Sequence, residues 1–175
     1  MLTTLERLKS MSALAAQPDD VLILLIKAAS AEIEAYLNRQ LEAKDVVERV
    51  DGPQGPFLNL SRYPVRSIAS IEAGGAALAD FEVLMPEVGR LLKEDGWPAG
   101  VFNVRIAYRG GYILPGDEGA DLPENIELAC ILQVQSLLRQ PGVVSERVGD
   151  LSVTYEGGKM SSAVRSLLDG YRRFT

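Results

Sequence analysis

Apolar and polar residues alternate along residues 101–108, which is the pattern of a half-buried strand. The expected apolar side comprises Phe102, Val104, Ile106 and Tyr108. Gly110 and Gly111 then permit a sharp exit of the backbone. Pro123 lies where a first helical turn tolerates proline, and Asp121 is its expected N-cap, so the sequence predicts a helix that runs to about Gln140.

An amphipathic helix is predicted upstream, from about Asp20 to Gln40. Its apolar face comprises Leu22, Leu25, Ile26, Ala29, Ile33, Tyr36 and Leu37. We expect Asp19 and Asp20 to cap the positive end of the helix and Arg39 to lie at its negative end. One apolar face implies one packing partner.

Proline and glycine interrupt the chain repeatedly between residues 43 and 108, which leaves room for short strands only. The expected strands cover residues 46–50, 57–60, 65–72, 81–85, 89–93 and 101–108. The long helix that follows is apolar on more than one side, so it is either a central core helix or one that also touches a neighbouring subunit. Cys130 lies on this helix and is most simply a small buried residue.

After the helix stop at Pro141-Gly142, Leu151, Val153 and Tyr155 alternate with polar residues and predict a further strand. Such a strand can return to its own domain or add to the sheet of another chain. A short helix from Ser162 to about Gly170 should follow it. The predicted fold class is therefore α+β: two long amphipathic helices form a helical body with a small strand-rich region between them, and an extended C-terminal arm ends in a short helix. The predicted division is a body of residues 1–140 and an arm of residues 141–175.

Composition narrows the function classes. The chain has 175 residues, of which 47% are hydrophobic, and no apolar run approaches the roughly 20 residues that cross a bilayer. Its single cysteine excludes an intramolecular disulfide. The net charge is −6; residues 141–175 contain five basic and four acidic residues, so the remainder carries −7. An acidic body argues against binding through phosphate neutralisation. It fits a ring through which DNA slides, although solubility alone explains the same charge.

Candidate chemistry is sparse. The sequence has no histidine, which excludes the Ser-His and Cys-His nucleophile pairs and every zinc site that contains histidine. Gly158-Lys159 does not complete a phosphate loop, because Met160 stands in place of the required Ser or Thr. Adjacent carboxylates serve more often as caps or solvated charges than as an acid/base pair. We therefore expect no enzyme activity, no cofactor and no metal site, and an enzyme that acts through carboxylates alone is the remaining catalytic alternative.

Four segments in a fixed order resemble the tailed-phage head-tail connector family, also called adaptor or head-completion proteins. They are VLILLIKAASAEIEAYLNRQL, FLNLSRYPVRSIASIE, VFNVRIAYRGGY with the following DLPENIELACILQVQSLLR, and VGDLSVTYEGG with SSAVRSLLDGYRRF. Residues 73–100 lie outside this resemblance.

The resemblance implies a structural virion protein at the head-tail junction, assembled in the host cytoplasm. Many copies, commonly twelve, would form a homo-oligomeric ring that binds the portal, extends the DNA channel and receives the stopper or tail-completion protein. Duplex DNA would pass through without specific binding, and no membrane would be involved. The portal-docking arm would comprise Leu151, Val153, Tyr155, Val164, Leu167, Leu168, Tyr171, Arg172, Arg173 and Phe174. The alternative is a soluble cytoplasmic protein-binding module unrelated to virions.

Overall fold

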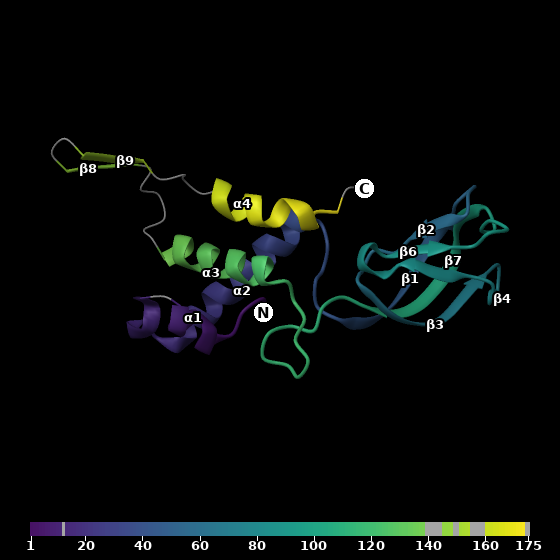
Figure 1. Cartoon of the computed structure of the whole chain (residues 1–175), viewed down its shortest axis with the longest axis horizontal. Helices are drawn as coiled ribbons and strands as arrows, with labels where there is room; N and C mark the ends of the chain where they lie inside the picture. Colours follow the sequence, from purple (N-terminus) through teal and green to yellow (C-terminus); the bar gives the residue numbers. More distant parts are fainter. Residues whose placement is uncertain (12, 139–144, 149–150, 155–159, 174–175) are drawn as a thin grey trace. The chain divides into compact units, whose positions relative to one another are not determined.

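The computed structural model describes residues 1–11, 13–138, 145–148, 151–154 and 160–173 (Figure 1). The chain forms two units. One unit combines residues 1–38 with residues 114–175, and the other is the continuous segment 39–113. The first unit contains the long helices and the second contains both larger sheets, so the predicted α+β class is confirmed. The division into a body of residues 1–140 and an arm of residues 141–175 stays a prediction.

The helical unit is built on contacts of α2 with α1 and α3, and of α3 with α4. Its elements are α1 (Leu5–Met11), a 3₁₀ turn (Ala13–Ala16), α2 (Asp19–Leu37), α3 (Glu124–Leu138), α4 (Ser162–Leu168) and a second 3₁₀ turn (Asp169–Tyr171). The buried face of α2 consists of Leu22, Ile26, Ala29, Ile33 and Leu37. These positions recur every three or four residues, which places them on one side of the helix.

Two expectations about the ends of α2 were wrong. Pro18 is the N-cap and no side chain caps the helix, although Asp19 and Asp20 do lie in the first turn. Asn38 ends the helix in the left-handed conformation, with φ 54°. Arg39 therefore leaves the helix axis and is buried in the sheet unit, with its guanidinium 3.6 Å from the centre of the Tyr63 ring.

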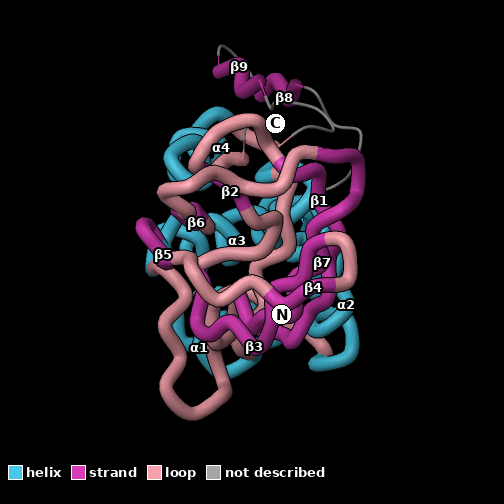
Figure 2. The backbone as a smooth tube through the Cα atoms, turned by 90° about the vertical axis from the view of Figure 1, so that its right-hand side faces the viewer, coloured by secondary structure: helices cyan, strands magenta, loops and turns pink. Residues whose placement is uncertain are grey.

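The sheet unit contains two antiparallel sheets, whose strands alternate with loops in Figure 2. Its strands are β1 (Lys44–Gly52), β2 (Phe57–Asn59), β3 (Val65–Ala73), β4 (Ala76–Ala77), β5 (Glu82–Met85), β6 (Arg90–Leu92) and β7 (Gly100–Gly110), with a 3₁₀ turn at Pro86–Val88. The first sheet has the order β1-β7-β3-β4 and the second has the order β2-β6-β5. All six expected strands are present, and their ends differ from the predictions by up to two residues.

One core fills the sheet unit. It comprises Leu58, Leu60, Val65, Ile71, Ala73, Leu91, Trp97, Val104, Ile106 and Tyr108. The Trp97 indole N–H donates to the Pro56 carbonyl at 2.9 Å, so the ring is buried without an unpaired donor. Phe102 was expected on the buried side of β7 and is instead 63% exposed. The β1-β7 ladder shifts register between Val50 and Gly52, and Phe102 has φ 46°, which breaks the alternation at this end of the strand.

The two ends of the sheet unit are held together by main-chain hydrogen bonds. The Tyr112 N–H donates to the Leu41 carbonyl at 2.6 Å, and the Ala43 N–H donates to the Tyr112 carbonyl at 2.8 Å. Gly111, with φ 108°, makes this approach possible, because a Cβ there would lie 2.5 Å from the Glu42 carbonyl oxygen. The glycine pair was predicted to allow a sharp exit from the strand. The structure gives the reason: at Gly111 the neighbouring backbone lies so close that no side chain would fit.

Candidate interaction surfaces

The C-terminal helix α4 packs on its own unit. Ser161 caps it by accepting a hydrogen bond from the Val164 N–H at 3.3 Å. Val164 and Leu168 are 1% and 0% exposed, and α4 lies against α3. A seven-residue helix is too short to be stable by itself, so this apolar contact is what keeps it folded. Two of the ten predicted docking residues therefore belong to the core of the helical unit.

The turn after α4 is attached to the C-terminal end of α2. The Tyr36 hydroxyl donates to the Asp169 carboxylate, and this hydrogen bond raises the pKa of Tyr36. The Arg172 guanidinium lies 5.2 Å from the centre of the Tyr36 ring. The Arg173 N–H donates to the Leu37 carbonyl at 2.9 Å, which satisfies one of the carbonyls left open at a helix end.

The outward part of this segment is what remains available to a partner. Leu167, Tyr171 and Arg173 are half-buried and Arg172 is exposed. Tyr155 and Phe174, which were also predicted docking residues, lie outside the described residues. The structure thus brings the described C-terminal docking residues together on one short segment, and their use in docking stays a prediction.

Leu151 and Val153 belong to β9 (Leu151–Thr154), which pairs with β8 (Ser145–Val148) as a two-stranded antiparallel sheet of its own. Strand β8 was not predicted from the sequence. The signal that could have found it is Gly149-Asp150, a typical two-residue hairpin connection between two short strand patterns. A two-stranded hairpin is marginally stable alone in water and has two outer edges that can accept a further strand.

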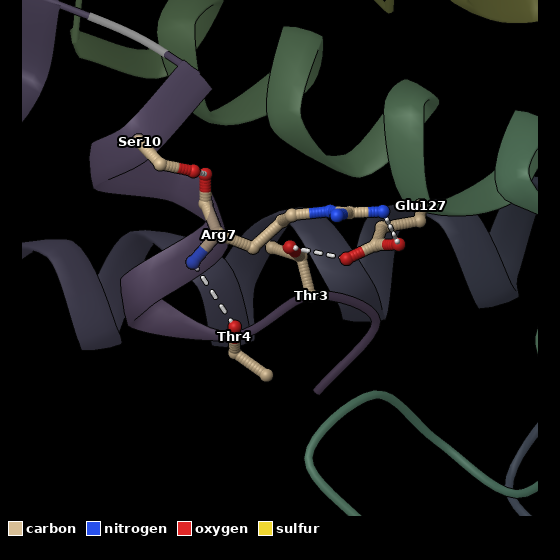
Figure 3. Close-up of polar contacts among 5 residues, drawn as sticks. All are labelled: Thr3, Thr4, Arg7, Ser10 and Glu127. Atoms are coloured by element: carbon tan, nitrogen blue, oxygen red, sulfur yellow. Dashed lines mark hydrogen bonds and ion pairs between the residues drawn. The ribbon is translucent and has the colours of Figure 1, made fainter. Parts of the chain in front are cut away.

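A groove of about 240 Å³ lies between α1 and α3 in the helical unit. Figure 3 shows Arg7 extending from α1 toward Glu127 on α3, with an ion-pair distance of 3.6 Å. The Thr3 hydroxyl donates to the same carboxylate at 3.0 Å. These contacts join the N-terminal segment to α3. Because Arg7 and Glu127 in this groove pair with each other, the pair serves to hold α1 on α3.

The described residues hold no group of three or more metal-binding side chains. Cys130 is buried at 0% exposure, its thiol lies 3.8 Å from the Ser30 hydroxyl, and burial raises its pKa to about 11. A thiol with such a raised pKa is a poor nucleophile at neutral pH. No helix in the described ranges has both the length and the apolar character needed to cross a bilayer.

Comparison with known proteins agrees with this structural character. A family model described as "Head completion protein" matches residues 1–174. This match confirms the resemblance inferred from the sequence. None of the curated proteins matches the chain.

The chain is also similar to proteins in three solved structures of gene transfer agent (GTA) particles. A chain from the neck of an empty GTA particle, computed with C6 symmetry, has a TM-score of 0.62 and 17% identity, with 97% of this chain and 86% of that chain covered. A chain from the virion of a native particle has a TM-score of 0.58 and 16% identity, with 91% of this chain and 80% of that chain covered. A chain from the neck of a native particle, computed with C12 symmetry, has a TM-score of 0.61 and 16% identity, with 97% of this chain and 88% of that chain covered. At these identities the likeness shows a shared fold.

Proposed function

Because the chain belongs to the head completion protein family, we propose that it is a structural neck component that joins the portal of a phage-like head to the stopper or tail. The observation that carries this proposal is the family match, which spans residues 1–174. Head completion proteins are structural, so membership also confirms the expectation of a non-enzymatic protein. The site of action is the head-tail junction, after assembly in the host cytoplasm.

The proposed assembly is a homo-oligomeric ring of twelve copies. Support comes from the fold shared with neck chains of particles that have C6 and C12 symmetry. A ring repeats one heterologous contact, so each subunit must present two different complementary surfaces. The chain offers two such candidates in its separate helical and sheet units.

The proposed portal contact is the C-terminal arm, residues 141–175. Its hairpin can extend a sheet of the portal by main-chain pairing, with specificity supplied by side chains on alternate positions. Its terminal segment presents Arg172 beside the half-buried Leu167 and Tyr171. The hairpin and this segment would act together, while Val164 and Leu168 hold the segment on the helical unit.

Duplex DNA would pass through the ring without specific binding. The net charge of −6 supports this part of the proposal, because a protein that binds through phosphates needs a clustered basic surface. An acidic channel wall repels the DNA backbone weakly and leaves it free to move.

Main-chain pairing by the hairpin can be tested with two substitutions at one position. Val153→Pro removes a backbone donor, so we expect few heads to carry the protein in electron micrographs, while thermal unfolding of the free subunit changes little. Val153→Thr keeps the β-branched shape and the N–H, so heads should be completed nearly as in the wild type. Normal head completion by the proline variant would show that β9 is not an assembly element.

A further inference from the structure

The outward face of the four-stranded sheet carries an ordered set of arginines. Across strands β1, β7 and β3 the register aligns Arg49, Arg105 and Glu72 in one row. Two residues further along the strands, at about 7 Å, the next row is Val47, Ala107 and Ser70. The third row is Asp45, Arg109 and Ser67. Three guanidinium groups thus surround a row of small or β-branched side chains.

Two of these arginines are neutralised within the sheet and one is not. Arg105 pairs with Glu72 at 3.4 Å, and Arg109 pairs with Asp45 at 3.3 Å. Arg49 is exposed and has no carboxylate within ion-pair distance among the described residues. It also lies directly opposite Arg105 in the ladder, an arrangement that is unfavourable for like charges. An external carboxylate would relieve this repulsion.

The helical unit offers the complementary charge. Residues 1–38 and 114–138 contain three basic and ten acidic residues. The acidic residues are densest in the loop before α3 and at the first residue of that helix, where Asp117, Glu118, Asp121 and Glu124 occur with no lysine or arginine between residues 114 and 138.

This loop is shaped by two consecutive turns. The Asp117 N–H donates to the Leu114 carbonyl at 3.2 Å, and the Ala120 N–H donates to the Asp117 carbonyl at 3.3 Å. Gly116 and Gly119 have φ 101° and 77°, which suits the turns. Asp117 and Glu118 are both exposed at its tip. The carboxylates are therefore held outward on a defined loop.

We propose that the arginine face of the sheet in one copy binds the acidic loop, residues 117–124, of a second copy. This inference rests on the proposed ring and specifies its subunit contact. The contact is heterologous, since a basic sheet face meets an acidic loop on the helical unit, and in a closed ring each copy uses its sheet face toward one neighbour and its loop toward the other. Arg49 supplies the unpaired cation on the edge strand β1 of this face, and the row of small side chains leaves room for the loop to approach.

Charge reversal on each side tests the contact. Sedimentation velocity should be run at about 0.01 M salt, where screening is weakest. We expect Arg49→Glu alone and Glu118→Arg alone each to weaken self-association about tenfold, because attraction becomes repulsion. A one-to-one mixture of the two variants should associate again, because each reversed face then meets a reversed loop on the other variant. Native mass spectrometry of the mixture should show equal numbers of both subunits. Lys27→Glu changes the net charge as Arg49→Glu does but lies on α2, and it should associate like the wild type.

Either of two results refutes the contact: Arg49→Glu associates like the wild type, or Lys27→Glu loses association as much as Arg49→Glu does. A chain that carries both Arg49→Glu and Glu118→Arg should also associate; association of this double variant without association of the mixture would overturn the contact between copies. A wild type and mixture that both stay monomeric also refute the contact. Attachment to heads is scored separately by electron microscopy, so a protein that self-associates but never joins heads would refute the neck function and leave the contact intact.

Discussion

Truncation of one leucine should reveal whether α4 is part of the folded core. Leu168 is 0% exposed and lies on the side of α4 that faces its own unit. Leu168→Ala removes three buried carbon atoms and leaves a cavity, so we expect a loss of about 2–5 kcal/mol in the free energy of unfolding. For a chain of this size, each 1 kcal/mol corresponds to about 2–4 °C in Tm.

Leu167 provides a matched control, because it is the adjacent leucine on the same helix and is only half-buried. Leu167→Ala should cost about 1 kcal/mol, since less apolar surface leaves the core. Far-UV circular dichroism during urea unfolding reports the helices, and the fluorescence of Trp97 reports the core of the sheet unit. We expect Leu168→Ala to lower the urea midpoint of the helical signal more than Leu167→Ala does. Equal midpoints for the two variants would show that α4 is not held on α3 in solution.

Three other predictions address charge, backbone crowding and the thiol. Replacing both Arg172 and Arg173 with Glu should weaken binding to portal-containing heads. Added salt should weaken wild-type binding similarly, since exposed charges are screened over about 8 Å. Tight, salt-sensitive binding of free DNA by the wild type would contradict a role of these arginines in portal binding. Gly111→Ala should cost at least about 1–2 kcal/mol in denaturant unfolding, because φ is 108° and the new Cβ would meet the Glu42 carbonyl; an unchanged midpoint would refute the crowding. Cys130 should resist thiol reagents at about pH 8 until the protein unfolds, and rapid labelling of the native protein would argue against its burial. Because the raised pKa favours the neutral thiol in the folded state, the contribution of Cys130 to stability should be lost as the pH rises from 9.0 to about 11.

Local sequence signals placed most of the regular elements correctly. Proline and glycine interrupt the chain between the short strands, so six of the seven strands of the sheet unit could be located from this punctuation, and only the two-residue β4 was not expected. The three-to-four-residue recurrence of Leu22, Ile26 and Ile33 likewise identified the buried face of α2. These features depend on residues close together in the chain, which is why one sequence suffices to predict them.

Features that depend on distant residues were not predicted. The order β1-β7-β3-β4 brings Arg49 opposite Arg105, and neither position signals the other in the sequence. Arg39 was interpreted as a helix-end charge, yet its planar group stacks on Tyr63, a partner that only the folded sheet unit supplies. Phe102 follows the strand alternation in sequence, but a register shift in the neighbouring strand overrides that pattern. The docking residues of the arm were identified by resemblance, which does not distinguish buried Leu168 from half-buried Leu167.

The main-chain bonds that join Leu41, Ala43 and Tyr112 have a consequence for synthesis on the ribosome. The sheet unit is one continuous segment whose ends meet, so it can complete its core as soon as Ile113 has left the exit tunnel. The buried face of α2 is made earlier but must wait for α3, because its packing partner is encoded after the whole inserted segment. We therefore expect nascent chains stalled before residue 114 to expose the apolar side of α2 to chaperones, and chains that include α3 to be released from them.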